Sequence, residues 1–361
     1  MSRMILVVLF AVAHGACSDD DRSPLDGAPD IGSVDQEPGV DLGVDQAPDG
    51  PSACDPALDL KPLALDGAYC VTRRFDLPAG SGAFALRGDE IYVFGMDGTP
   101  PIGSVQQATI DPVTGKPGAY SAVLSFTPTL SGTLFPSEYV ALSPAAVVAV
   151  GYTQSSTFEG ELFWGDKGIK TPKLVDKASG NFDAIFLDDT TLLINGAGVG
   201  TAQEGQGVYL HQGGKAARRL IKEMGAMSGF MALGSQVVFA GGYFTGGSKI
   251  YGFTLAKVKA AIAGGTTLTP SDGQLVLDGS AGDAVALGDD LVVATMNDSW
   301  MFKAVSRIPI TVSGNQISAG QPVELVTGSG ASVSRLAASG ARLALLLQGS
   351  SNSEVVIVEQ K

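Results

Sequence analysis

A pattern of about 45 to 50 residues recurs from residue 80 onward and constrains the fold more than any other feature of the chain. Each copy has a short first segment of small and apolar residues, a polar turn, a strongly apolar second strand and one or two further strands. The second strands fall at residues 91–95, 146–151, 192–196, 237–242, 291–294 and 343–347. Such continuous apolar runs are typical of strands covered on both faces by neighbouring sheets.

The recurring unit is a four-stranded sheet, which cannot cover its own apolar faces, so the copies must stack on one another. Radial stacking covers those faces and also protects most strand edges. We therefore predict an all-β fold, a six-bladed β-propeller. Seven blades is the alternative, because one repeat boundary can be placed differently.

The count of fourth strands predicts how the ring closes. Five repeats contain one, at residues 120–126, 173–176, 217–221, 274–277 and 322–326. The sixth repeat has only three strands before the chain ends at Lys361. The segment Tyr69–Asp76 precedes the first repeat and has the composition of a strand. We expect it to complete the last blade beside residues 354–359.

The fourth copy carries two further local features. Its segment Phe239-Ala240-Gly241-Gly242-Tyr243, followed by Ile250-Tyr251-Gly252-Phe253, resembles a kelch repeat, which has an apolar strand, a Gly-Gly pair and a later aromatic residue. The other copies lack the doublet and the spaced tryptophan, so the resemblance supports the fold and implies no activity. Residues 255–262 predict a helix that connects two strands of this blade.

The first 16 residues have the pattern of a signal peptide. Arg3 precedes an apolar run at residues 4–13. As a helix this run would span about 15 Å, half of a bilayer's hydrocarbon, which suits a signal-peptide core better than a membrane span. The alternative is a buried N-terminal strand or helix.

His14-Gly15-Ala16-Cys17 resembles the bacterial lipobox, in which small residues precede a cysteine that is lipidated before the leader is removed. The resemblance implies lipidation of Cys17, and Ser18 after it implies the outer membrane or cell surface. His14 stands where the family has an aliphatic residue, so secretion or periplasmic release without a lipid is the alternative. An acyl anchor would be the only contact with the membrane.

Residues 17–52 are predicted to be a disordered tether before the domain at residues 53–361. Between residues 18 and 50 there are ten acidic residues, one basic residue and no aromatic residue. Such a segment buries too little apolar surface to offset the entropy of ordering it. Asp41, Asp45 and Asp49 suggest calcium binding as an alternative, but calcium loops place their ligands two residues apart.

The charge of the remaining chain excludes some partners. Residues 51–361 contain 27 acidic and 21 basic residues. A mildly acidic domain gains nothing from releasing counterions from phosphates, so we expect no nucleic-acid partner. The same acidity opposes electrostatic binding to an anionic membrane.

Cys54 and Cys70 are the two cysteines that follow the leader. An even pair in an exported chain predicts a disulfide, which would attach the end of the tether to the first strand of the domain. The loop-closure model gives such a bridge about 3 kcal/mol. A redox pair is the alternative, although redox pairs normally have the closer spacing Cys-x-x-Cys.

Few residues of the domain suggest catalysis. His211 is its one histidine and is expected to be an ordinary strand residue. The glycines at residues 196–200 resemble a dinucleotide fingerprint, but no helix follows, so a hairpin turn is expected. Acidic pairs recur at one repeat position and predict turn formation rather than catalysis; they are Asp89-Glu90, Asp188-Asp189 and Asp289-Asp290. We predict no catalytic, cofactor or metal site.

These features favour a lipid-anchored, non-enzymatic propeller outside the cytoplasm that binds a protein or glycan at one face. The first alternative is an extracellular hydrolase or lyase that acts on a polymer through carboxylates. The second is a scaffold subunit of an envelope assembly with an exposed apolar patch. Acidic and aromatic side chains converging in the central funnel would favour the enzyme, and a lining of Ser, Thr and Gly would favour binding.

Overall fold

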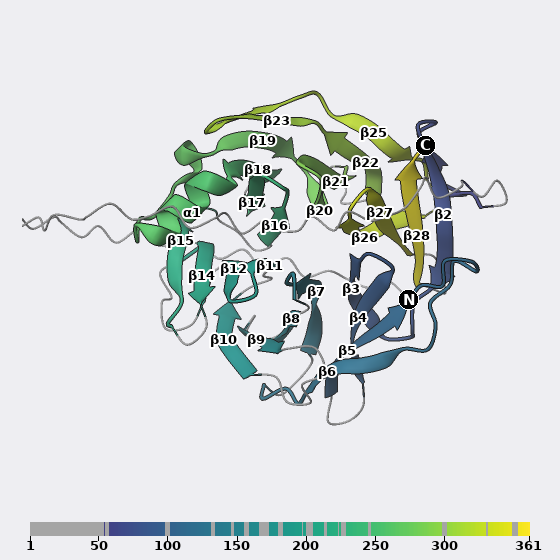
Figure 1. Ribbon diagram of the computed structural model, residues 1–361, viewed down its shortest axis with the longest axis horizontal. Coiled ribbons are helices and arrows are strands. Elements are labelled where there is room, and N and C mark those ends of the chain that lie inside the picture. The colour runs from purple at the N-terminus through teal and green to yellow at the C-terminus, as the bar shows by residue number, and fades with distance from the viewer. Residues whose placement is uncertain are drawn as a thin grey trace, which may run out of the picture. The chain divides into compact units, whose positions relative to one another are not determined.

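Six β-sheets surround a central axis in the computed structural model, which confirms the six-bladed β-propeller (Figure 1). The structure describes residue 54 and residues 58–97, 102–130, 134–145, 148–154, 159–165, 173–179, 183–196, 198–199, 205–212, 215–222, 224, 229–244, 247–297, 302–329, 331–348 and 353–361. Within these residues, no helix is long and apolar enough to cross a membrane.

The first three blades each contain four antiparallel strands, which follow one another in chain order from the axis outward. The first has β3 (Ser81–Arg87), β4 (Glu90–Asp97), β5 (Ile102–Thr109) and β6 (Ser121–Phe126). The second has β7 (Leu134–Leu142), β8 (Val148–Gln154), β9 (Glu159–Gly165) and β10 (Lys173–Ser179). The third has β11 (Asp183–Asp188), β12 (Thr191–Gly196), β14 (Gly207–Gln212) and β15 (Arg218–Lys222).

The other three blades follow the same plan, except that the last takes its outer strand from the N-terminal side of the domain. The fourth has β16 (Gly229–Leu233), β17 (Val237–Phe244), β18 (Gly247–Thr254) and β19 (Gln274–Gly279). The fifth has β20 (Ala281–Leu287), β21 (Asp290–Met296), β22 (Phe302–Ile308) and β25 (Val323–Thr327). The sixth has β26 (Ser332–Ser339), β27 (Arg342–Gln348), β28 (Ser353–Gln360) and β2 (Tyr69–Asp76).

The pairing of β2 with β28 closes the ring, as predicted (Figure 1). The two strands are antiparallel, with Cys70 opposite Glu359 and Asp76 opposite Glu354. Arg74 of β2 also forms a two-armed ion pair with Glu354, with N–O distances of 2.6 and 2.8 Å. The strand that precedes the first blade therefore fixes the last one.

The hydrophobic core is divided into six clusters, and each lies between two neighbouring blades. Between the first and second blades, the rings of Phe126 and Phe163 stack with their centroids 4.0 Å apart. Every residue of β12 is buried, as expected for a second strand with a sheet on each side. The apolar faces that one blade cannot cover are thus buried by the next blade.

Short segments of one blade also cover the outer strand of the blade before it. The two-residue strand β13 (Gly198–Val199), in the connection between β12 and β14, pairs with β10 of the second blade. The two-residue strand β1 (Ala64–Leu65), just before β2, pairs with β25 of the fifth blade. Neither strand was predicted.

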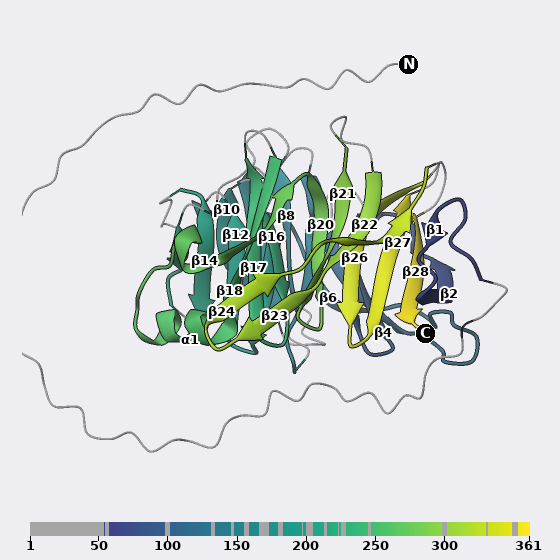
Figure 2. The ribbon, with the colours of Figure 1, turned by 90° about the horizontal axis from the view of Figure 1, so that it is seen from above.

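Two longer insertions, in the fourth and fifth blades, also cover the outer strand of the blade before them. The helix α1 (Leu255–Ala263) was predicted, and it lies with the short 3-10 helix η1 (Pro270–Asp272) between β18 and β19. After α1, Leu268 bridges to Ile221 in β15 of the third blade. The unpredicted hairpin of β23 (Ile310–Ser313) and β24 (Gln316–Ala319) lies against β18 and β19 of the fourth blade (Figure 2).

The sixth blade is covered by the first. Gly115, in the connection between β5 and β6, lies so close to β2 that an added Cβ would be 3.2 Å from Cδ of Arg73. Gly115 also has a positive φ of 66°, which glycine adopts without steric cost. Within the described residues, five of the six outer strands are thus covered by the blade that follows.

Candidate functional site

A central channel of about 310 Å³ runs between the innermost strands, and residues from all six blades line it. The lining residues are Phe84–Leu86, Tyr139–Leu142, Asp183–Phe186, Gly229–Leu233, Asp283–Ala286 and Leu336–Ala338. They come from β3, β7, β11, β16, β20 and β26, in that order. The radial arrangement therefore brings together residues that are distant in the sequence.

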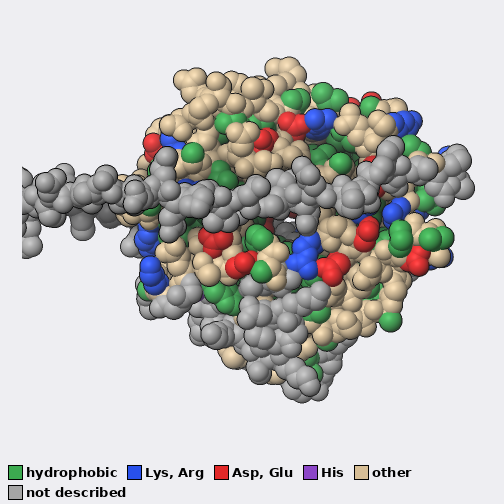
Figure 3. Space-filling model, viewed as in Figure 1, with side chains coloured by type: hydrophobic (Ala, Val, Ile, Leu, Met, Phe, Trp, Pro, Cys, Tyr) green, Lys and Arg blue, Asp and Glu red, His purple; other side chains and the backbone are tan. Residues whose placement is uncertain are grey.

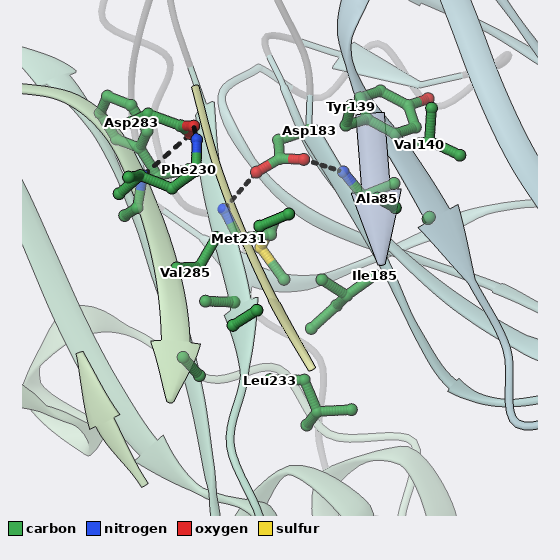
Figure 4. Close-up of a pocket in the computed structure, with 18 of the residues that line it drawn as sticks. Ala85, Tyr139, Val140, Asp183, Ile185, Phe230, Met231, Leu233, Asp283 and Val285 are labelled. Carbon is green, nitrogen blue, oxygen red and sulfur yellow. Dashed lines mark hydrogen bonds between the residues drawn. The ribbon is translucent and has the colours of Figure 1, made fainter. Parts of the chain in front are cut away.

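The channel wall is largely apolar, and its two ends differ. Figure 4 shows Asp183 and Asp283 at one end of the channel and Leu233 at the other, with Val285 and Met231 between them. The lining combines two carboxylates with four aromatic residues, Phe84, Tyr139, Phe186 and Phe230, among mostly aliphatic side chains, and its described residues include no Ser or Thr. It is an apolar tube with two carboxylates at one end.

Asp183 joins the third blade to the fourth. One of its carboxylate oxygens accepts the N–H of Met231 in β16 at 2.7 Å. The other accepts the N–H of the next residue, Ala184, at 2.8 Å (Figure 4). Both oxygens of this carboxylate thus act as acceptors of main-chain N–H groups.

Asp283 repeats this arrangement between the fifth and sixth blades. It accepts the N–H of Leu336 in β26 at 2.6 Å and the N–H of Ala284 at 2.9 Å. The register between β20 and β21 shifts between Ala281 and Asp283. A bulge at this position redirects the strand where the carboxylate reaches the next blade. Both carboxylates thus connect neighbouring blades at the channel wall.

Tyr139 lies beside Asp183 at this end of the channel. Burial, with the nearby negative charge of Asp183, raises the pKa of the Tyr139 phenol well above its usual value. The phenol is therefore neutral across the physiological pH range. It contributes an aromatic face and no charge.

The acidic pairs of the turns have several roles. Asp188 forms the predicted turn, because it accepts bonds from the N–H and hydroxyl of Thr190, each at 2.8 Å. Asp189 instead accepts the N–H of Ala145 in the second blade at 2.8 Å. Asp289 likewise accepts the N–H of Gln236 in the fourth blade at 2.6 Å. One acid of each of these two pairs thus binds the preceding blade.

The remaining acids of these three pairs form ion pairs with arginines. Asp290 accepts a bond from Nε of Arg307 at 2.5 Å, and Glu90 pairs with Arg87 at 2.6 Å. Asp89 pairs with Arg342 of the sixth blade at 2.6 Å. These acids lie at the turns between the first and second strands, where they are held by structural partners, and none of them lines the channel.

His211 lies in β14, as predicted, and is buried against Trp164 with ring centroids 5.2 Å apart. It is not among the residues that line the channel. In the glycine-rich segment after β12, the described residues Gly198 and Val199 form a strand rather than the start of a helix, so they do not open a dinucleotide site. No group of three metal-binding side chains occurs among the described residues.

Cys54 and Cys70 form the predicted disulfide, with their Cα atoms 5.6 Å apart. It attaches residue 54 to β2, the strand that closes the ring. The predicted lipidation site Cys17, the lipobox residue His14 and the tether with Asp41, Asp45 and Asp49 lie outside the described residues.

The sequence did not predict that Asp183 and Asp283 would link neighbouring blades. Both begin an Asp-Ala pair at the same position of their repeats, and this recurrence is visible in the sequence. Their acceptor role depends on N–H groups that lie 48 and 53 residues later in the chain. Only the radial arrangement of the blades places those groups within reach.

The sheet order and the central channel define the chain as a six-bladed β-propeller protein. The soluble aldose sugar dehydrogenase of Escherichia coli has a similar fold, with 14% identity, a TM-score of 0.50, and coverage of 81% of this chain and 99% of that one. The β-propeller domain of the trilobed protease of Pyrococcus furiosus also matches, with 9% identity, a TM-score of 0.42, and coverage of 79% and 96%.

The PQQ domain of pyranose dehydrogenase from Coprinopsis cinerea matches with 11% identity, a TM-score of 0.48, and coverage of 82% of this chain and 97% of that one. At these identities the likenesses concern the fold alone. No family model matches the chain, and no curated protein matches its sequence. The kelch-like character of the fourth blade therefore stays a prediction.

Proposed function

We propose that this chain is a non-enzymatic binding module, a β-propeller held outside the cytoplasm that recognises a ligand or partner without changing it covalently. One observation carries the proposal. The two carboxylates that line the channel, Asp183 and Asp283, each accept two main-chain N–H bonds, one of them from the next blade. Side chains held in this way support the wall of the channel.

Acid–base catalysis needs a group that reaches the reacting atoms and exchanges a proton with them. Asp183 and Asp283 lie at the same end of the channel, and this favours a second candidate function, a hydrolase or lyase that acts on an extracellular polymer (Figure 4). Their bonds to backbone amides oppose it, because these bonds hold each carboxylate against the wall of the channel and join two blades.

The charge distribution on the surface favours recognition of a specific partner over general attraction of anions or cations. On the face seen in Figure 3, acidic and basic side chains lie interspersed around the ring. A surface without a field of one sign does not concentrate polyanions such as nucleic acid. A protein or a neutral glycan fits this face better.

The proposed location rests on the sequence and on the disulfide. The leader, the lipobox-like segment that ends at Cys17 and the acidic tether support an acyl anchor in the outer membrane. The Cys54–Cys70 bridge supports export, since disulfides persist in oxidising compartments. Metabolic labelling with radioactive palmitate should mark the wild-type chain and leave Cys17→Ser unlabelled. Equal labelling of both chains would contradict the anchor.

Incubation of the full chain with a panel of envelope and extracellular polysaccharides tests whether it binds a polymer without cleaving it. We expect affinity electrophoresis to show retardation of the full chain by one or more polymers, without release of reducing ends or unsaturated products. Asp183→Asn and Asp283→Asn are assayed in parallel. Product formation that disappears in both variants would replace the binding module with the hydrolase or lyase.

A further inference from the structure

A second cavity, of about 250 Å³, lies between the fourth and fifth blades and shares no lining residue with the central channel. β19 of the fourth blade borders it on one side, and β21, β22 and the start of β25 of the fifth blade border it on the other (Figure 1). Half of its ten lining residues are aliphatic, proline or methionine. The polar half consists of Ser280, Thr295, Lys303, Ser306 and Glu324.

Ser306 is the polar residue of this cavity that is buried in β22. It is only 7% exposed, and its hydroxyl forms no hydrogen bond with another described residue. A buried hydroxyl without a protein partner costs free energy, and a ligand that supplies the partner recovers it. Ser306 thus marks the cavity as a place where a polar ligand would be stabilised.

Two charges of opposite sign complete the polar side. Lys303 and Glu324 both line the cavity and are exposed, which places them at its opening. Neither side chain forms an ion pair or a hydrogen bond with another described residue. The opening therefore offers one strong donor and one strong acceptor, with no net charge.

Two β-bulges bring these groups onto one surface. In β22, Lys303 is the extra residue of a bulge opposite β21, and in β25 the extra residue is Leu325, next to Glu324. Bulges of this kind redirect side chains. Ser306 lies directly opposite Glu324, and opposite residues of antiparallel strands have Cβ atoms about 5 Å apart. Lys303 lies about 10 Å along the strand from Ser306, and its flexible four-carbon side chain can span much of that distance.

From this lining we infer that the cavity binds one sugar unit of a neutral glycan. The inference rests on the proposed binding function and names a site and a ligand class for it. Sugar hydroxyls both donate and accept, so they match a lining of three hydroxyls, one ammonium group and one carboxylate. A neutral ligand meets no like charge at the opening. The aliphatic half of the lining packs against the C–H groups of the sugar ring.

Small probes test the ligand class directly. Methyl glycosides of glucose, mannose, galactose and N-acetylglucosamine are titrated into the full chain carrying Cys17→Ser, and binding is followed by saturation-transfer NMR. We expect at least one of them to bind. Glucuronate, glucosamine and glycine are the anionic, cationic and zwitterionic probes. Each should bind at least about tenfold more weakly than the best glycoside, because it meets a like charge or leaves the cavity hydroxyls without partners.

Variants of the lining locate the site. Ser306→Ala removes the buried hydroxyl without adding volume and should weaken glycoside binding about three- to tenfold. Lys303→Met should weaken it by a similar factor, whereas Lys116→Met, at an exposed lysine of the first blade, should not. Ser280→Trp should fill the cavity and abolish binding. Its matched control is Ser121→Trp, at an exposed serine of β6.

Thermal denaturation first establishes that each variant is folded. If Ser280→Trp does not fold, the probe series, Ser306→Ala and Lys303→Met still test the inference. No binding of any glycoside, binding that is unchanged in the lining variants, or tighter binding of a charged or zwitterionic probe would each overturn it. Polymer retardation without products would then leave the binding module in place, whereas product formation would remove the module whatever the cavity binds.

Discussion

Arg342 of the sixth blade pairs with Asp89 of the first, with 2.6 Å between the guanidinium and the carboxylate. The same guanidinium donates to Glu359 of β28 at 3.1 Å. The Arg342 and Glu359 side chains are only 15% and 13% exposed. The pair therefore reinforces the junction between the last and first blades, which β2 closes by main-chain pairing.

Arg342→Ala should lower the free energy of unfolding by about 1–3 kcal/mol, because it leaves two carboxylates without their partner. Urea denaturation measures the change. Lys61→Ala is the control, since Lys61 forms an exposed pair with Asp59 and its loss should have no measurable effect. Equal effects of the two substitutions would contradict the role of Arg342 at the junction.

Loss of the Cys54–Cys70 disulfide should also destabilise the domain. The bridge closes a short loop between residue 54 and β2, so the double variant Cys54→Ser, Cys70→Ser should unfold with about 3 kcal/mol less free energy. Reduction with dithiothreitol should destabilise the wild type by a similar amount and leave the double variant unchanged. A wild type that is indifferent to reduction would refute the contribution of the bridge.

The carboxylate of Asp289, a half-buried turn residue, should contribute measurably to the free energy of unfolding. It accepts both the N–H and the side-chain amide of Gln236 in the preceding blade, at 2.6 and 3.1 Å. Asp289→Ala should cost about 1–2 kcal/mol in urea denaturation. Asp278→Ala, in the exposed pair with Lys249, should change stability by less. The reverse order would show that the contact between blades contributes nothing.

The carboxyl of Asp272 should make the free energy of unfolding depend on pH in the acid range. Bonds from the N–H and hydroxyl of Thr269 lower the pKa of its carboxyl below the ordinary value. Its stabilising effect is therefore complete above the unfolded value of about 3.9 and is lost as the pH falls through the lower folded value. The stability difference between wild type and Asp272→Asn should be constant from pH 7 to 5 and shrink toward pH 2. A constant difference throughout would contradict this assignment.

Much of the ring could be predicted because its strands follow the repeat. The missing fourth strand of the sixth blade identified Tyr69–Asp76 as the closing strand, with the bounds found in β2. The helix predicted at residues 255–262 is present as α1, and the side chain of Thr254 caps its N-terminus. The hairpin β23–β24 was missed, although Gly314-Asn315 between alternating residues is a hairpin signal, because it lies inside one repeat unit.

The remaining features depend on partners distant in the sequence. β1 and β13 have two residues each, too few for a local pattern, and they are strands only through β25 and β10. Asp189 and Asp289 were predicted to form turns within their own blades. Their carboxylates instead bind N–H groups 44 and 53 residues earlier in the chain. Spatial neighbours of this kind leave no periodic trace in one sequence.

Among the described residues, five of the six outer strands are covered by the following blade, so the order of the blades around the ring has a direction. Removal of the fourth blade would uncover β15 and at the same time take away the surface on which the β23–β24 hairpin rests. A change in blade number would thus require coordinated changes in two neighbours. The blades are not interchangeable modules, and we expect the ring to unfold in one cooperative step rather than blade by blade.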